Sequence, residues 1–102
     1  MGRTRVVVTG MGALSAAGVG VDALWTAARS GQSAVSELEL PRPGRNYVTI
    51  AAQLKGFEPE QYIEYETLLF SDRFTQFAIV AGDQALAQAG LTATTRLVPA
   101  PR

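Results

Sequence analysis

Apolar residues recur with the spacing of an α-helix in two segments of the chain. The first segment runs from about Asp22 to Ser30, and its apolar stripe consists of Val21, Leu24, Trp25 and Ala28. Asp22 suits the positive N-terminal end of a helix dipole, and Arg29 suits the negative C-terminal end. Gly31 suits the left-handed position that follows many helices. The pattern therefore predicts a short amphipathic helix that ends at Ser30.

A longer helix is predicted from Asp72 to Ala89, with Ser71 as its N-cap and Gly90 as its end. At 1.5 Å per residue it would be about 27 Å long. Its apolar surface comprises Phe74, Phe77, Ala78, Ala81 and Ala85, widened by Ile79, Val80 and Leu86. Its few polar positions are Arg73, Gln76, Asp83, Gln84 and Gln88. A helix this apolar is normally buried between layers, and one small domain has difficulty covering it.

Three segments have the pattern of β-strands. Residues 4–9 form a β-branched run without alternation, which suits a strand covered on both faces, as in parallel sheets. Residues 35–40 and 47–54 alternate apolar and polar positions, which predicts strands with one wetter side. A polar turn or short helix is expected to lead on to Leu68.

The composition is that of an ordinary globular domain, with 47% hydrophobic and 18% charged residues among 102. Nine basic and nine acidic residues cancel, and the basic ones do not cluster. Charge-driven binding to nucleic acid or to an anionic membrane is therefore not expected. The run Val6–Val8 is far too short for a signal-peptide core or a membrane span, so we expect a cytoplasmic protein.

The chain has neither cysteine nor histidine, which limits its chemistry. Disulfides, zinc sites of the usual Cys/His type and cysteine- or histidine-based catalysis are excluded. A serine nucleophile needs a base, but the only side-chain amine is Lys55, and no Ser-x-x-Lys spacing surrounds it. Paired carboxylates could serve as acid and base, although a solvated connecting segment accounts equally well for Glu58, Glu60, Glu64 and Glu66. We assign no catalytic, cofactor-binding or metal-binding residue, and the substrate-binding residues stay unassigned.

A glycine-rich loop, Gly10-Met-Gly-Ala-Leu-Ser15, follows the first predicted strand. Dinucleotide-binding loops have a similar start, but their third motif position is glycine or alanine and their helix opens within the loop. Here the third position is Ser15, the helix pattern begins only near Asp22, and no strand with a terminal acid follows about 20 residues later. We interpret Gly10, Gly12 and Ser15 as a structural strand-to-helix loop and not as a nucleotide site.

Taken in order, the segments resemble β-ketoacyl-acyl-carrier-protein synthases. The likeness is carried by Arg5–Ser15, the Trp25 helix with Gly31-Gln-Ser-Ala34, Ile50–Phe57, Ser71–Ala78 and Ala85–Leu91. It implies the N-terminal portion of a thiolase-like α/β fold with α-β-α-β-α layers, which usually forms a homodimer. On this basis residues 1–91 are a partial N-terminal ketosynthase domain. Residues 92–102 are an irregular tail, in which Arg96–Val98 starts a strand that prolines cut short.

The resemblance also implies a reaction, the decarboxylative condensation of an acyl thioester with malonyl-carrier protein in fatty acid or polyketide synthesis. In that family a cysteine takes up the acyl group and two histidines assist, without a further cofactor. None of these residues occurs here, so the chain covers about a quarter of such an enzyme and is expected to be inactive alone. Acyl carrier protein is the implied partner. Relatives place basic residues just before the long helix, whereas Tyr62–Ser71 has none, which leaves Arg73 as the nearest candidate contact. The alternatives are a non-catalytic partner of the chain-length-factor type and a small stand-alone binding module.

Overall fold

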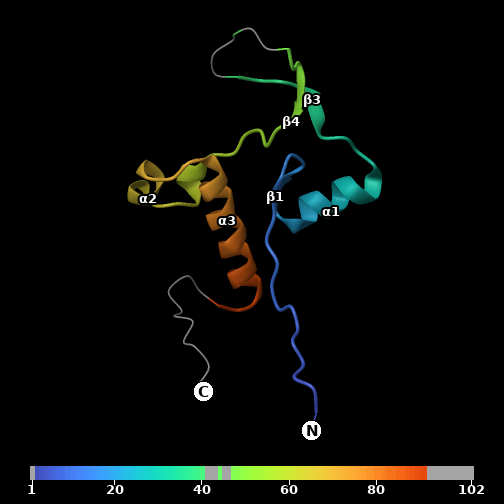
Figure 1. The fold of residues 1–102 in the computed structure, drawn as a ribbon, viewed down its shortest axis with the longest axis vertical. Helices are drawn as coiled ribbons and strands as arrows, with labels where there is room; N and C mark the ends of the chain where they lie inside the picture. The colour runs from blue at the N-terminus through green and yellow to red at the C-terminus, as the bar shows by residue number, and fades with distance from the viewer. Residues whose placement is uncertain (1, 41–43, 45–46, 92–102) are drawn as a thin grey trace.

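The computed structural model describes residues 2–40, 44 and 47–91, and it combines helices with short strands (Figure 1). In chain order the elements are β1 (Leu14–Ser15), β2 (Gly18–Val19), α1 (Val21–Ser30), β3 (Val35–Glu37), β4 (Ile50–Ala52), the 3-10 helix η1 (Pro59–Gln61), α2 (Tyr65–Leu69) and α3 (Arg73–Gln88). The mixed content agrees with the α/β class. The expected layering is not visible, because the described strands form only two separate antiparallel pairs.

The two strand pairs are small. In the first, Leu14 lies opposite Val19 and Ser15 lies opposite Gly18. The second pairs β3 with β4 over three residues each, from 35–37 to 50–52. Both alternating segments of the sequence therefore pair with each other, although over shorter spans than predicted. Their apolar side remains uncovered, since Ile50 is 62% exposed.

Both predicted helices form close to their expected bounds. Helix α1 ends at Ser30 as expected, and the φ of 70° at Gly31, the residue that follows, is left-handed. Helix α3 begins at Arg73, one residue later than the predicted start at Asp72, so Ser71 as N-cap is wrong. The cap is Asp72, whose Oδ1 accepts hydrogen bonds from the Thr75 backbone N–H at 3.4 Å and from the Thr75 hydroxyl at 2.8 Å. A carboxylate satisfies the free N–H groups there and also suits the helix dipole, whereas the Ser71 hydroxyl donates backward to the Leu68 carbonyl.

The strand predicted over residues 4–9 is absent from the structure, which is a correction to the sequence pattern. This segment has no regular secondary structure, and Figure 1 shows it leading away from the rest of the chain. A strand forms only against a partner strand, and no described segment lies beside it as one. The further strand start at Arg96–Val98 and the predicted tail 92–102 lie outside the described residues.

The buried core is formed by Phe57, Ile63 and Val80. Residues packed around it are Leu14, Val19, Leu54, Leu68, Phe77 and Ile79. They come from β1, β2, the segment after β4, η1–α2 and α3, so the core joins both ends of the described chain. It covers α3 only in part, because Phe74 remains 73% exposed. Within the described residues no helix is long and apolar enough to cross a membrane.

Candidate functional site

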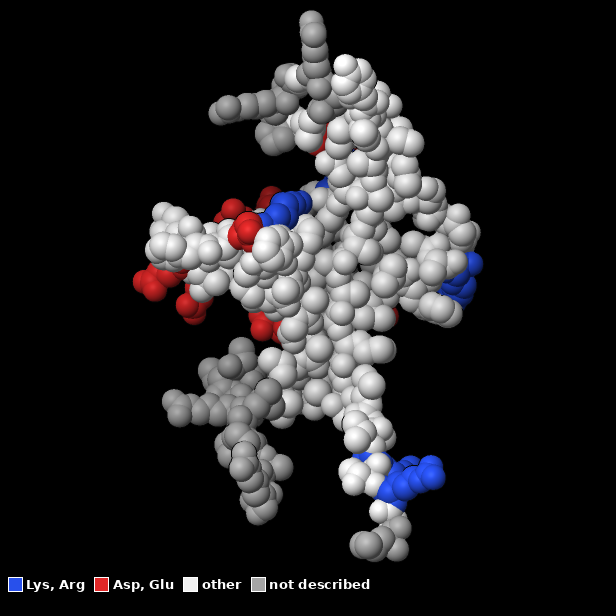
Figure 2. Space-filling view, in the orientation of Figure 1, with Lys and Arg blue, Asp and Glu red and all other residues white. Residues whose placement is uncertain are grey.

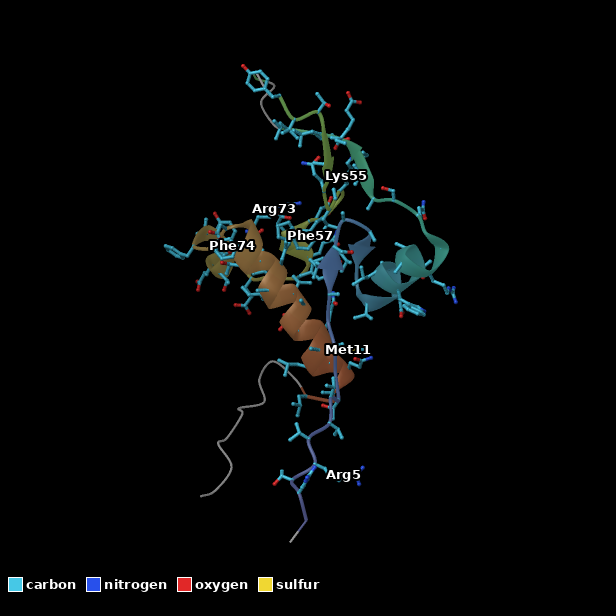
Figure 3. The ribbon with its side chains drawn as sticks, turned by 45° about the vertical axis from the view of Figure 1, so that its right-hand side comes forward. Arg5, Met11, Lys55, Phe57, Arg73 and Phe74 are labelled. Atoms are coloured by element: carbon cyan, nitrogen blue, oxygen red, sulfur yellow. The ribbon has the colours of Figure 1, made fainter. Side chains whose placement is uncertain are left out.

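The glycine-rich loop lies along α3, and two glutamine side chains hold it there. The Met11 backbone N–H donates to Gln88 Oε1 at 2.7 Å, and the Ala13 backbone N–H donates to Gln84 Oε1 at 2.9 Å. Two residues of extended chain advance about 6.6 Å, and the four residues between the glutamines rise about 6 Å along a helix. The two repeats match, so alternate N–H groups of the loop meet successive turns of α3 (Figure 3).

The two glycines of this loop face the α3 backbone at a distance that leaves no room for a side chain. A Cβ at Gly12 would overlap the Ala81 carbonyl oxygen and would lie 2.8 Å from the Ala81 carbonyl carbon. A Cβ at Gly10 would overlap the Ala85 carbonyl oxygen and would lie 3.0 Å from the Ala85 carbonyl carbon. Neither glycine has a positive φ. Glycine is therefore required at both positions for close approach and not for unusual backbone angles.

Ser15 lies apart from this contact, in the hairpin that follows. Its Oγ accepts a hydrogen bond from the Ala17 backbone N–H at 3.2 Å, inside the turn between β1 and β2. The hairpin continues into α1 through Gly20, whose N–H donates to the Ala13 carbonyl at 2.8 Å. The loop N–H groups of Met11, Ala13 and Ala17 are thus bonded to the chain's own side chains. A phosphate-binding loop would direct such donors to its ligand, so this geometry does not support a nucleotide site.

A shallow cavity of about 470 Å³ lies beside α1. Its polar lining includes Asp22, Thr26 and Ser33. The Ser33 hydroxyl accepts from the Val35 backbone N–H at 3.2 Å, and no described contact pairs it with a base. Among the described residues there is also no cluster of carboxylates able to hold a metal ion. The cavity therefore lacks the nucleophile–base pair that covalent catalysis needs.

Arg73, the candidate contact for an acidic partner, is engaged within the chain. One guanidinium nitrogen donates to the Leu54 carbonyl at 3.1 Å. The guanidinium also lies over two aromatic rings, 5.6 Å from the centre of Phe57 and 5.1 Å from that of Phe77. Since the two rings meet edge to face at 5.3 Å, Arg73 covers the outer side of the core. In this structure the Arg73 side chain therefore packs against the core.

The remaining candidate charges lie on the surface. Lys55 forms an ion pair with Glu39 at 3.2 Å, next to the β3–β4 pair. Glu58, Glu60, Glu64 and Glu66 are all exposed, and Figure 2 shows acidic residues gathered on the α2 side of the molecule. Of these four, Glu58 accepts a hydrogen bond from Gln61 Nε2 at 2.7 Å. This arrangement is that of a solvated connecting segment.

A family model described as the N-terminal domain of beta-ketoacyl synthase matches residues 3–98. The chain belongs to this family. It is 41% identical over 91 residues to 3-oxoacyl-[acyl-carrier-protein] synthase 2 of Vibrio cholerae, covering 89% of this chain and 22% of the relative. A Streptomyces cyaneus protein, named as a polyketide beta-ketoacyl synthase 2, is 32% identical over 97 residues, covering 95% of this chain and 23% of the relative. The chain thus spans less than a quarter of the length of these relatives.

Sequence reasoning missed the role of Gln84 and Gln88, which we had placed among the exposed polar positions of the helix. Gln84 is in fact half-buried against the loop, and both glutamines bind it. The available signal was a matching pair of spacings. Ala81 and Ala85 are four residues apart, as are the glutamines, and the glycines are two residues apart. Each alanine is followed three residues later by a glutamine, so small side chains and side-chain amides share one face of the helix. An extended backbone can lie on such a face.

Proposed function

We propose that this chain provides the N-terminal part of a β-ketoacyl-acyl-carrier-protein synthase. The complete protein performs the decarboxylative condensation of an acyl thioester with malonyl-carrier protein, in fatty acid or polyketide synthesis. The observation that carries this proposal is the family match over residues 3–98, which includes the glycine loop and both main helices. The relatives are named as synthases, so neither a stand-alone binding module nor a non-catalytic partner is favoured.

In this proposal the chain supplies scaffold, and the reacting groups come from the rest of the enzyme. A cysteine thiolate suits acyl transfer because it is both a good nucleophile and a good leaving group. The chain contains no cysteine and no histidine. Its contribution is to fix the glycine loop against α3, so that the segments on either side enter the larger fold in defined directions. Alone it forms no ketoacyl product.

The proposal extends to architecture and location. Residues 1–91 form part of a thiolase-like layered domain, residues 92–102 lie outside that part, and the full-length enzyme is a cytoplasmic homodimer. The uncovered apolar side chains support the larger assembly, since Val7, Trp25 and Phe74 are each more than half exposed here. A monomeric soluble protein seldom exposes such side chains in groups.

Acyl carrier protein is the proposed partner of the complete enzyme. Its acidic surface would need basic contacts, but Tyr62–Ser71 offers none, and Arg73 is bound to Leu54, Phe57 and Phe77. The exposed glutamates of the same region would repel an acidic protein. We therefore propose that the carrier contacts come mainly from parts of the enzyme beyond these residues.

The test is a chimera in which residues 3–91 replace the matched N-terminal segment of the Vibrio cholerae synthase. The chimera and the 102-residue chain are each incubated with malonyl- and acyl-carrier protein, and ketoacyl product is detected by mass spectrometry. We expect product from the chimera and none from the chain. A folded chimera without activity would contradict the proposed function, and product from the chain alone would contradict its scaffold role.

A further inference from the structure

Acidic and apolar side chains share the outer face of α2. At about 100° per residue around a helix, Leu68 packs toward the core and Glu66 lies on the opposite side. Leu69 and Phe70 flank Glu66 on that outer side and are 59% and 92% exposed. Tyr65, next to Leu69 around the helix, is 71% exposed. We call Tyr65, Glu66, Leu69 and Phe70 the α2 face.

The surroundings of the α2 face are acidic as well. Residues 56–72 contain five carboxylates and no lysine or arginine. Glu58, Glu60 and Glu64 are exposed in or next to η1, which packs against α2. Figure 2 shows acidic side chains gathered on this side of the molecule. Among the described residues, no lysine or arginine forms an ion pair with any of these carboxylates, so their negative charge is not balanced within the described chain.

The core holds the α2 face in place. Ile63, just before α2, is buried, and the ring of Tyr62 stacks on that of Phe57 with the ring centres 5.7 Å apart. The Ile63 backbone N–H donates to the Pro59 carbonyl at 2.9 Å, which closes η1 onto the start of α2. A partner would therefore meet a preformed surface, and a preformed surface lowers the ordering cost of binding.

The position of Glu66 limits what can cover this face. A purely apolar layer over Leu69 and Phe70 would also remove the Glu66 carboxylate from water without a partner, which is strongly unfavourable. A second copy of the same face would bring further carboxylates against it, and like charges repel. The occupant must therefore place a lysine or arginine against Glu66 and apolar side chains against Leu69 and Phe70.

A separate protein suits this requirement better than an inner layer of the same enzyme. Lysine and arginine are rarely buried fully inside a fold, whereas an interface commonly combines an apolar centre with a charged rim. An amphipathic helix presents both kinds of side chain on one side, at positions three and four residues apart. Cations at the edge of such a helix would meet Glu60 and Glu64 beside the α2 face.

We propose that the α2 face is a docking site for a basic amphipathic helix of a separate protein. Lysines or arginines of that helix pair with Glu66 and with the glutamates around it, and its apolar side chains cover Leu69 and Phe70. This inference goes beyond the proposed function, which assigns no partner to this surface.

The probe is a short fluorescein-labelled helical peptide of leucine and lysine, compared with a peptide that has glutamate in place of every lysine. Each peptide is titrated by fluorescence anisotropy into the 102-residue chain and into the chimera. We expect both proteins to bind the lysine peptide and neither to bind the glutamate peptide. Added salt should weaken the binding, because the carboxylates are exposed.

Substitutions locate the binding. The combined variant E60Q/E64Q/E66Q should weaken binding of the lysine peptide by about tenfold, as the loss of several exposed ion pairs predicts. F70S should weaken it by about fivefold or more, because it removes an apolar contact without touching the charges. The matched control is E37Q, which neutralises an exposed glutamate on β3 and should leave binding unchanged.

The contrary results are distinct. Equal binding of the two peptides, or an equal effect of E37Q and the combined variant, would overturn the inference. Binding that F70S leaves unchanged would show attraction by charge alone and would also overturn it. Binding to the chain but not to the chimera would identify the rest of the synthase as the occupant. A chimera that binds the peptide but forms no ketoacyl product would contradict only the proposed function.

Discussion

Gly12 and Ala81 meet at the point where the N-terminal loop crosses α3, and no side chain fits between their backbones. A Cβ at Gly12 would also lie 2.9 Å from the Cβ of Gln84, the residue that binds Ala13. The close approach and the hydrogen bond therefore depend on each other. Together they join the first and last described elements of the chain.

Replacing Gly12 by alanine should weaken this junction. Because the obstructing atoms are backbone atoms of α3, they cannot move aside without bending the helix, and we expect a loss of about 1–3 kcal/mol. The free energy of unfolding of the chimera, measured in urea, checks this. The matched control is G82A, within α3, where an added Cβ meets nothing within 4 Å. G82A should stabilise by about 0.5–1 kcal/mol, because alanine is the better helix former. Equal effects of the two substitutions would contradict the close approach.

Gln84 should matter more than Gln88, although both bind the loop. The hydrogen bond from the Ala13 N–H to Gln84 is half-buried. The hydrogen bond from the Met11 N–H to Gln88 is exposed, so water can replace the Gln88 side chain as acceptor. We expect Q84M to cost about 1–2 kcal/mol and Q88M less than about 0.5 kcal/mol. Q84E keeps an acceptor oxygen and should recover part of the loss. Urea unfolding of the three variants decides, and an equal loss for Q84M and Q88M would speak against this difference in burial.

Arg73 should stabilise the core through its guanidinium plane as well as its charge. R73K keeps the charge but loses the planar group that lies over Phe57 and Phe77. We expect a loss of about 0.5–1.5 kcal/mol in thermal or urea unfolding. R29K, at an exposed position in the last turn of α1, is the control and should be nearly neutral. If R73K were also neutral, the contact with the rings would contribute no stability.

The N-cap of α3 can be assigned by a pair of substitutions. D72A removes the oxygen that accepts from Thr75 and should cost about 1 kcal/mol, whereas S71A should cost clearly less. D72N keeps an acceptor and should lie between the two. Unfolding free energies measured near neutral pH provide the comparison. A larger loss for S71A than for D72A would restore Ser71 as the cap.

The parts of this fold that the sequence predicted are those with local causes. The helix that ends at Ser30, just before Gly31, and the long helix that ends near Gly90 follow from apolar periodicity and glycine position. The cap was misplaced by one residue because both Ser71 and Asp72 are good capping residues, and only geometry decides which one reaches Thr75. The family resemblance, which rested on several ordered segments, is confirmed by the match over residues 3–98.

The parts that were wrong or missed have distant causes. A strand over residues 4–9 requires a partner that no described segment supplies, whatever its intrinsic propensity. The bonds from Gln88 and Gln84 to the loop join residues 77 and 71 positions apart, so no local pattern specifies them. The contacts of Arg73 with Leu54 and Phe57 were missed because these two residues lie outside α3. These contacts depend on how segments meet in space.

The most direct test of the central claim is the initial rate of ketoacyl formation by three forms of the chimera: unaltered, G82A and G12A. If the chain is the N-terminal scaffold of a synthase and the loop–helix junction holds it, the first two should make product at similar rates. G12A should be slower, because an added Cβ at Gly12 would force the loop away from α3. A folded but inactive unaltered chimera, or a G12A chimera as fast as G82A, would contradict the account.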